Sequence, residues 1–406
     1  MGKLLLTRRS FLSALGCSAA ASPVIAPMAF ASAPWDTRFV TIILRGAMDG
    51  LDVLRPIGDP HYNALRPTLN TGSLPLGGTG GFWALHPALA TLMPMWDRGE
   101  LGFAHATSTP YRDKRSHFDG QDLLEAGTGF DVGVGAVRDG WLNRMLQTVP
   151  GVEADTAFAI GRDDMLLLSG AAPVSNWSPG TRLDLSPQAR RLLEMVYDED
   201  PRYKAAVLEA LDLTAAIDAA EAAPDDAGDM AMEAMMEGLN ANQAHVQMAD
   251  FAVDRLREDS RIAAFSLNGW DTHGNQQNQL PRALGALAEV LLLLRTGLGP
   301  IWQKTGVVVM TEFGRTAGEN GTRGTDHGTG GLMIFAGGAL KGGQVLGRWP
   351  GLAEADLYDR RDLMPTEDVR AYAARAMQGL FGVDETTLGG SIFPGLDFGG
   401  APRFVL

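Results

Sequence analysis

Short apolar runs alternate with longer amphipathic stretches along most of the chain. The runs predict β-strands at Arg38–Leu44, Leu101–His105, Ala157–Ile160, Ile262–Leu267, Gly306–Thr311 and Leu332–Ala336. The residues from Val307 to Met310 are apolar at successive positions, which is typical of a parallel strand covered on both faces. Helices are predicted at Pro87–Arg98, Phe118–Ala126, Trp141–Thr148, Pro281–Trp302 and Thr366–Phe381. The alternation predicts an α/β three-layer sandwich with a mostly parallel sheet.

One segment departs from this alternation. From about residue 186 to residue 259 the pattern is almost wholly helical and rich in Ala, Met and Glu, with a loop at 222–228. We interpret it as a helical insertion in a single domain formed by residues 32–406. Its methionines are interpreted as soft packing residues, the alternative being a thioether metal site. They are Met230, Met232, Met235, Met236 and Met248.

The first 31 residues predict a twin-arginine signal peptide. Arg8 and Arg9 precede a mildly apolar stretch, and small residues ending at Ala31 suit cleavage before Ser32. We therefore expect the twin-arginine translocase as a partner during export. The mature chain is then expected in the bacterial periplasm or outside the cell.

Two alternatives exist for the same segment. A retained amphipathic helix is disfavoured because Pro23 and Pro27 interrupt it. Lipidation of Cys17 is disfavoured because the residues before it form a poor lipidation signal. Cys17 is the only cysteine, so the mature chain would depend on an ordinary core rather than on disulfides.

The balance of charge restricts the partners. The chain has 34 Lys+Arg and 48 Asp+Glu, a net charge of −14, which becomes −17 without the three basic residues of the signal peptide. So acidic a protein is not expected to bind nucleic acid or an anionic membrane. The leucine-rich run Ala283–Leu298 contains Glu289 and Arg295, so no membrane span is predicted in the mature chain.

Candidate metal ligands follow three of the predicted strands. Asp49 lies just beyond the first strand, at the sheet edge where open α/β sheets bind ligands. The alternative for Asp49 is a helix N-cap or turn residue. Asp271 and His273 follow the strand that ends at Leu267, and in extended backbone residues two apart point to the same side. A carboxylate and an imidazole so placed can share one cation.

A glycine-rich loop between the last two predicted strands carries a second pair of this kind. Asp326 and His327 lie between Gly324 and Gly328. Glycines allow the backbone to turn and to approach a bound ion closely. The pair is therefore a further candidate metal site.

Ser116 begins the predicted helix that follows the second strand. Free backbone N–H groups at a helix start, with Arg112, Lys114 and Arg115 nearby, favour an anion there. The alternative is that Ser116 caps the helix, with Asp119 at the third position.

Taken in order, these segments resemble the DUF1501 family. This family is placed in the alkaline phosphatase-like superfamily, with sulfatases, phosphodiesterases and cofactor-independent phosphoglycerate mutases. The stretches that carry the resemblance are Leu44–Leu51, Arg115–Asp122, Trp270–His273, Thr311–Thr316 and Gly324–Gly328.

The resemblance implies two metal ions at the carboxyl edge of the sheet and a hydroxyl nucleophile at a helix start. Ser116 looks like the nucleophile, and Arg315 or Arg115 would contact the anionic group. Asp49 looks like a ligand of one metal together with Asp326 and His327, while Asp271 and His273 look like ligands of the other.

The chain departs from the superfamily pattern in two respects. The pair Asp271 and His273 is more closely spaced than the usual arrangement. Two-metal phosphatases of this kind usually carry a further histidine downstream, and no histidine follows His327. Either His117, His105 or His86 takes its place, or one metal site is incomplete. We include His117 among the candidate ligands.

The leading functional prediction is a secreted metal-dependent hydrolase acting on a small anionic phosphate or sulfate ester. One or two divalent ions are expected, and zinc, manganese, calcium and magnesium all remain compatible. The alternative is a non-catalytic secreted or surface-assembly protein that keeps the fold and a partial metal site. A mutase is disfavoured because its substrates are cytoplasmic.

Overall fold

The computed structural model describes residues 35–112, 114–129, 139–149, 152, 156–160, 165–177 and 244–406. The chain divides into two compact units, and the fold below belongs to the unit formed by Met28–Asn176 and Ala244–Leu406. The predicted signal peptide, Cys17 and most of the predicted insertion lie outside the described residues. Within that insertion, residues 244–257 are helical, and Met248 is buried.

A sheet runs through the centre of this unit, in the order β11-β5-β10-β9-β1-β8-β6-β7, with β12 beside β5. β1 pairs in parallel with β8 and β9, and β6 with β8. β10 is antiparallel to both of its neighbours, β5 and β9. The strands are β1 Arg38–Leu44, β5 Leu101–Ser108, β6 Ala157–Ile160, β7 Ser175–Trp177, β8 Ile262–Leu267, β9 Thr305–Thr311, β10 Gly331–Ala336, β11 Val345–Leu346 and β12 Glu367–Asp368.

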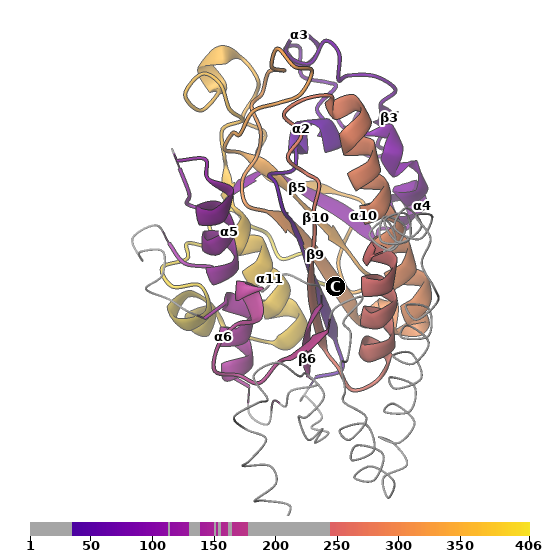
Figure 1. Cartoon of the computed structure of the whole chain (residues 1–406), viewed down its shortest axis with the longest axis vertical. Helices are drawn as coiled ribbons and strands as arrows, with labels where there is room; N and C mark the ends of the chain where they lie inside the picture. The colour runs from indigo at the N-terminus through magenta and orange to yellow at the C-terminus, as the bar shows by residue number, and fades with distance from the viewer. Residues whose placement is uncertain are drawn as a thin grey trace, which may run out of the picture. The chain divides into compact units, whose positions relative to one another are not determined.

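Helices cover both faces of this sheet. In Figure 1, α5, α6 and α11 lie on one side of the strands, and α4 and α10 lie on the other. The longer helices are α4 Met93–Asp97, α5 His117–Ala126, α6 Trp141–Gln147, α10 Gln276–Leu298 and α11 Val369–Phe381. The arrangement confirms the predicted α/β three-layer sandwich with a mostly parallel sheet.

Shorter elements connect these layers. A separate three-stranded sheet has the order β2-β4-β3, and short helical turns flank the larger elements. They are β2 Leu54–Arg55, β3 Leu74–Pro75, β4 Ala84–Leu85, α2 Gly50–Val53, α3 Tyr62–Leu65, η1 Pro87–Leu92, η2 Leu166–Leu168, η3 Gly299–Lys304, η4 Glu354–Asp356, α12 Glu385–Thr387 and η5 Leu388–Ile392.

The central strands are buried along their whole length. Every residue of β1 and of β9 is buried, as expected for strands covered on both faces. One core cluster of described residues joins Phe39 of β1 to Trp141 of α6 and Tyr372 of α11. Burial of these large side chains provides most of the driving force for this packing.

Two predicted helices start at other residues in the structure. α10 begins at Gln276, with Pro281 inside the helix, rather than at Pro281. The chain at Glu367 pairs with Thr107 of β5, so the predicted helix from Thr366 instead starts at Val369. In both places the tertiary contacts outweigh the local preference of proline and of polar residues.

One described helical segment, Gln276–Lys304, is long and apolar enough to cross a membrane by length and composition alone. The residues of α10 that are buried within this unit form a stripe from Leu280 to Leu298. A core helix packed on a sheet meets the same criterion, so this observation is weak evidence for a membrane span.

Candidate metal centre

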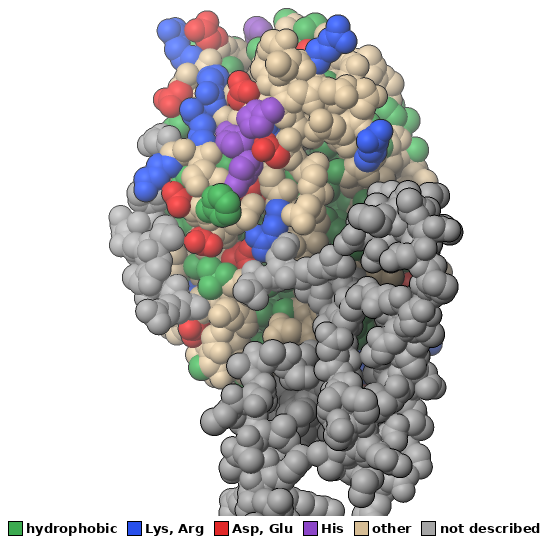
Figure 2. Space-filling view, in the orientation of Figure 1, with side chains coloured by type: hydrophobic (Ala, Val, Ile, Leu, Met, Phe, Trp, Pro, Cys, Tyr) green, Lys and Arg blue, Asp and Glu red, His purple; other side chains and the backbone are tan. Residues whose placement is uncertain are grey.

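Three histidine side chains converge on the carboxylate of Asp271. The Nε2 atom of His273 lies 3.1 Å from Asp271 Oδ1, and that of His327 lies 3.3 Å from the same oxygen. The Nε2 atom of His117 lies 3.5 Å from Asp271 Oδ2. We call these four residues, His117, Asp271, His273 and His327, the histidine cluster. Figure 2 shows histidine side chains gathered on one face, with acidic and basic side chains beside them.

The spacing of the ligand atoms suits a single cation. One ligand atom from each of His117, Asp271 and His327 lies within 4.8 Å of the other two. The Nε2 atoms of His273 and His327 are 2.9 Å apart. Bonds of roughly 2.1 Å to a tetrahedral ion place its ligands roughly 3.4 Å from one another. The distances of 3.1, 3.3 and 3.5 Å from the imidazole nitrogens to the Asp271 oxygens lie close to that value.

The fold explains why these residues meet. Asp271 and His273 follow the carboxyl end of β8, and His117 begins α5, which follows β5. His327 precedes β10, and because β10 is antiparallel, its start lies at the edge where β9 ends. The antiparallel strand therefore brings His327 to the same edge as the other ligands.

Each of the three imidazoles has an oxygen partner at its other nitrogen. His117 Nδ1 lies 2.7 Å from Glu312 Oε1, and His273 Nδ1 lies 3.3 Å from Asp326 Oδ1. His327 Nδ1 lies 2.9 Å from the carbonyl oxygen of Arg115. A proton held on Nδ1 by such a partner leaves the Nε2 lone pair facing the cluster, which is the usual arrangement of metal-binding histidines.

Glu312 is the most enclosed of these partners. Its side chain is fully buried at the end of β9, and Oε1 accepts hydrogen bonds from the backbone N–H groups of Gly46 and Ala47, each at 3.0 Å. Glu312 was not among the predicted site residues, although the Thr311–Thr316 motif contains it. The signal was available, because an acidic residue beyond the end of a buried strand is the pattern that selected Asp49.

Arg315 is buried behind Asp271 rather than exposed to a ligand. Its guanidinium donates to the carbonyl oxygens of Ala47, Thr325 and Gly46 at 2.7, 3.0 and 2.6 Å, and to Asp271 Oδ1 at 2.5 Å. Arg315 thus orients Asp271 and joins three loops. The geometry favours a positioning role, and direct contact of Arg315 with a substrate stays a prediction.

Charge and burial set the protonation of the cluster. Burial alone would raise the pKa of Asp271, but the Arg315 guanidinium holds this pKa below its ordinary value. The hydrogen bond to Glu312 raises the pKa of His117, whereas burial lowers the pKa of His327. An anionic carboxylate therefore lies among imidazoles at neutral pH, which is a suitable ligand set for a cation.

Asp49 has a different set of partners. Both of its oxygens accept hydrogen bonds from Arg66, at 2.5 and 3.0 Å, and Oδ2 also accepts from Gln276 at 2.6 Å. Asp49 occupies the N-cap position of α2, as the alternative predicts, but its side chain makes no capping hydrogen bond. As a metal ligand, Asp49 stays a prediction.

Asp326 contacts the cluster from outside. Its Oδ1 accepts from Asn320 Nδ2 at 3.0 Å in addition to its contact with His273. The hydrogen bond from Asn320 lowers the pKa of Asp326. The carboxylate is thus placed to orient His273, and its direct binding of a metal stays a prediction.

Ser116 lies at the first turn of α5, next to His117. Its Oγ accepts from the N–H of Asp119 at 3.4 Å, so the predicted capping alternative is present in the structure. The N–H of Ser116 donates to the hydroxyl of Tyr111 at 2.8 Å. The neighbouring Arg115 is one-third exposed and lies 3.4 Å from Asp362 Oδ2. The role of Ser116 as nucleophile stays a prediction.

Three histidines were candidates for the place of the absent downstream histidine, and the structure gives each of them different contacts. His117 belongs to the histidine cluster. His86 accepts a hydrogen bond from the N–H of Ala88, at 3.1 Å, as the cap of η1. His105 is buried, with its ring centroid 4.9 Å from that of Trp83.

Two glycines let the loop that carries His327 approach its neighbours. A Cβ atom at Gly324 would lie 2.4 Å from the carbonyl carbon of His273, and one at Gly328 would lie 2.4 Å from that of Arg315. Neither distance is tolerated by a real side chain. The predicted close approach of this glycine-rich loop is therefore present, with backbone rather than an ion on the other side.

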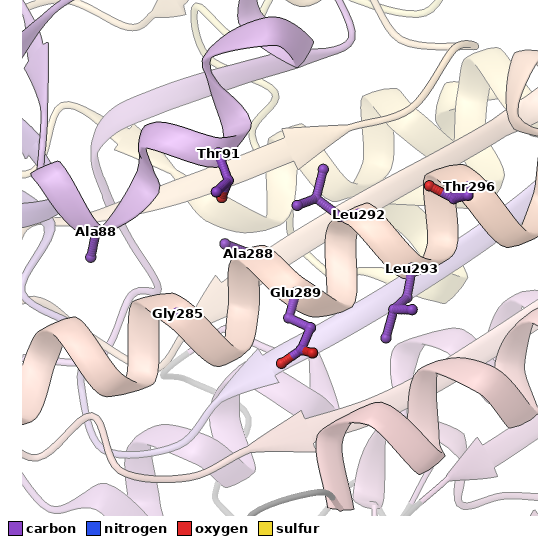
Figure 3. Close-up of a pocket in the computed structure, with 8 residues that line it drawn as sticks. All are labelled: Ala88, Thr91, Gly285, Ala288, Glu289, Leu292, Leu293 and Thr296. Carbon is purple, nitrogen blue, oxygen red and sulfur yellow. The ribbon is translucent and has the colours of Figure 1, made fainter.

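An apolar groove of about 390 Å³ lies elsewhere, along α10. Figure 3 shows Leu292, Leu293 and Glu289 on this helix, and the Glu289 carboxylate lies 2.8 Å from Nε2 of His245. None of the described residues that line the groove is a candidate ligand.

Comparison with known proteins adds a family and a set of similar structures. The model of the family described as "Protein of unknown function (DUF1501)" matches residues 107–388. No curated protein matches the chain.

The similar solved structures belong to the class of proteins that the resemblance predicted. A protein of the alkaline phosphatase superfamily from Vibrio parahaemolyticus is 11% identical, with a TM-score of 0.35, and the match covers 82% of this chain and 69% of that one. The zinc complex of the C-terminal periplasmic domain of EcEptC from Escherichia coli is 10% identical, with a TM-score of 0.34 and coverage of 76% and 77%. A 2-O GAG sulfatase is 9% identical, with a TM-score of 0.34 and coverage of 75% and 65%. Sequence identities and TM-scores this low do not support an inference about activity.

Proposed function

Since the chain belongs to the DUF1501 family, whose description gives no function, we propose one from the histidine cluster: a secreted, metal-dependent hydrolase of phosphate or sulfate esters. The observation that carries this proposal is the convergence of three imidazole Nε2 atoms on the Asp271 carboxylate, each ring with an oxygen partner at Nδ1. Such an arrangement has the ligands and the outer partners of a metal site.

The donor set fits some divalent ions better than others. Three nitrogens and one carboxylate suit zinc or manganese, whereas calcium and magnesium prefer sites made of oxygen alone. His117, His273, His327 and Asp271 would hold the ion. Bound there, it would lower the pKa of an attacking hydroxyl and neutralise charge on the transferred group.

The residues around the cluster would bind and orient the ester. The N-terminal turn of α5 would present backbone N–H groups to an anionic ester, and Ser116 lies at that turn, one residue before His117. Ser116 is the proposed nucleophile. The partly exposed Arg115 is the proposed contact for an ester oxygen, and the buried Arg315 keeps Asp271 in position.

Location is part of the same proposal. Residues 1–31 would direct export by the twin-arginine translocase, and residues 32–406 would act in the periplasm or outside the cell as one domain with the helical insertion. Folding before transport would allow the ion to be loaded in the cytoplasm.

The test uses purified, metal-replete mature protein. Aryl phosphate, phosphodiester and sulfate ester substrates are assayed with the wild type, with an Asp326→Ala/His327→Ala variant and with His61→Ala as a control. His61 is exposed and lies outside the cluster. Hydrolysis of one ester class by the wild type and the control, but not by the double variant, supports the proposal. Unchanged activity of the double variant removes this site from the mechanism.

A non-catalytic protein with a structural metal is the second candidate. The observation in its favour is that Arg66 and Gln276 engage both oxygens of Asp49, which the resemblance implies as a metal ligand. A wild-type protein that hydrolyses none of the esters, and whose metal cannot be removed without unfolding, supports this candidate.

A further inference from the structure

The buried pair Asp49–Arg66 bears on how many ions the chain binds. Asp49 is 1% exposed and Arg66 is fully buried. Beyond its two bonds to Asp49, the guanidinium donates to the carbonyl oxygens of Ala317 and Thr316, at 2.7 and 2.8 Å. Arg66 is therefore held by both its charge partner and the backbone.

The Arg66 guanidinium already neutralises the Asp49 carboxylate, as a bound cation otherwise would. Burial would raise the pKa of Asp49, but the Arg66 guanidinium, together with the hydrogen bond from Gln276, holds that pKa below its ordinary value. A cation that bound Asp49 would have to displace Arg66 and leave its charge buried without a partner. Burying a charge without a partner is strongly unfavourable.

Neighbouring side chains fix the pair in place. The Nε2 atom of Gln276 donates to Asp49 and also to Asp52, at 2.6 and 2.8 Å. Its Oε1 atom accepts from the hydroxyls of Thr272 and Thr325, each at 2.9 Å. Thr272 precedes His273 and Thr325 precedes Asp326, so this network joins both loops that carry the histidine cluster.

The remaining ligands of the implied second ion are also engaged elsewhere. Asp326 contacts Asn320 and the outer nitrogen of His273, and His327 faces Asp271. The residues that would share an ion with Asp49 are thus divided between the cluster and its outer partners.

We propose that the chain binds one metal ion, at the histidine cluster, and that Arg66 takes the place of a second cation at Asp49. This inference rests on the proposed function for the first ion only. Asp49 and Gln276 are then positioning residues, which hold the two ligand loops through Thr272 and Thr325.

Metal stoichiometry tests this inference without an activity assay. The mature chain is stripped with a chelator, saturated with Zn²⁺, dialysed and measured by elemental analysis. Asp49→Asn and Asp271→Asn are matched variants, since each exchanges one carboxylate for an amide. We expect one zinc per chain in the wild type and in Asp49→Asn, and none in Asp271→Asn.

Other results would overturn one proposal or the other. Two zinc ions per wild-type chain, or loss of the only ion in a folded Asp49→Asn variant, contradict the single-ion inference and leave a metal hydrolase possible. No zinc in the wild type, or full retention in Asp271→Asn, instead removes the metal centre on which the proposed function depends. If circular dichroism shows that Asp49→Asn does not fold, the wild-type count decides.

Discussion

The Nδ1 atom of His117 lies 2.7 Å from Oε1 of Glu312, across 195 residues of sequence. Glu312 also accepts from the backbone of Gly46 and Ala47. One carboxylate therefore joins the start of α5, the end of β9 and the loop after β1. Because the same contact orients His117, Glu312 links the stability of this sheet edge to the geometry of the cluster.

Replacing Glu312 by Gln is expected to weaken metal binding by 10- to 100-fold, the usual effect of removing an outer partner of a metal-binding histidine. An amide keeps one acceptor for the backbone N–H groups but cannot hold the His117 ring as a carboxylate does. Zinc affinity is measured by competition with a chromophoric chelator. Glu354→Gln, at an exposed position, is the control and should bind zinc as the wild type does.

Replacing Ser116 by Gly separates its two possible roles. Glycine at an N-cap costs only a few tenths of a kcal/mol relative to serine, so the free energy of unfolding should hardly change. Hydrolysis should fall to background, because the proposed nucleophile is gone, while zinc content stays the same. Hydrolysis at the wild-type rate would leave Ser116 as a helix cap only.

Replacing Arg66 by Ala is expected to lower the free energy of unfolding by about 3–5 kcal/mol, because it leaves the Asp49 carboxylate buried and unpaired. Urea unfolding followed by circular dichroism measures the change. The control is Arg360→Ala, which removes an exposed pair with Glu354 and should cost less than about 1 kcal/mol. Equal effects of the two substitutions would show that the buried pair contributes little.

Because His105 is buried, we expect the free energy of unfolding to fall in acid. Burial lowers the pKa of His105 from 6.5 to about 4. Above pH 6.5 the His105 ring is neutral in both the folded and the unfolded chain. Its protonation then takes nothing from the free energy of unfolding. Between pH 6.5 and pH 4 only the unfolded chain gains this proton, so unfolding becomes easier by about 1.4 kcal/mol per pH unit, and the effect levels off below pH 4.

The measurement is the free energy of urea unfolding at several values between pH 7 and pH 4. His105→Gln should reduce the slope by about 1.4 kcal/mol per pH unit, since the amide does not titrate. His61→Gln, at an exposed position, should leave the slope unchanged. An unaltered slope in His105→Gln would mean that other groups cause the acid sensitivity.

Much of the fold could be predicted because burial leaves a direct mark on the sequence. The predicted bounds of β1, β6 and β8 agree with the structure, since each is a largely apolar run. The start of α11 could not be predicted, because Glu367 and Asp368 are polar and suit either a cap or an edge strand. Pairing of Glu367 with Thr107, 260 residues away in sequence, decides between them.

The site was predictable to the extent that it depends on strand ends. His117, Asp271, His273 and His327 were all selected, and the structure brings them together. The division of the carboxylates was not predictable. Asp49 and Asp271 follow neighbouring strands in similar contexts, and each contacts a buried guanidinium. Arg66 engages both oxygens of the buried Asp49, whereas Arg315 engages one oxygen of the half-exposed Asp271, and only the tertiary structure decides this difference.

The backbone contacts of Gly324 and Gly328 make the cluster sensitive to substitutions that alter no charge and delete no polar group. A single methyl group at either position would push the Thr325–His327 segment away from His273 or Arg315. The integrity of the site therefore depends on two hydrogen atoms as much as on its imidazoles and carboxylates.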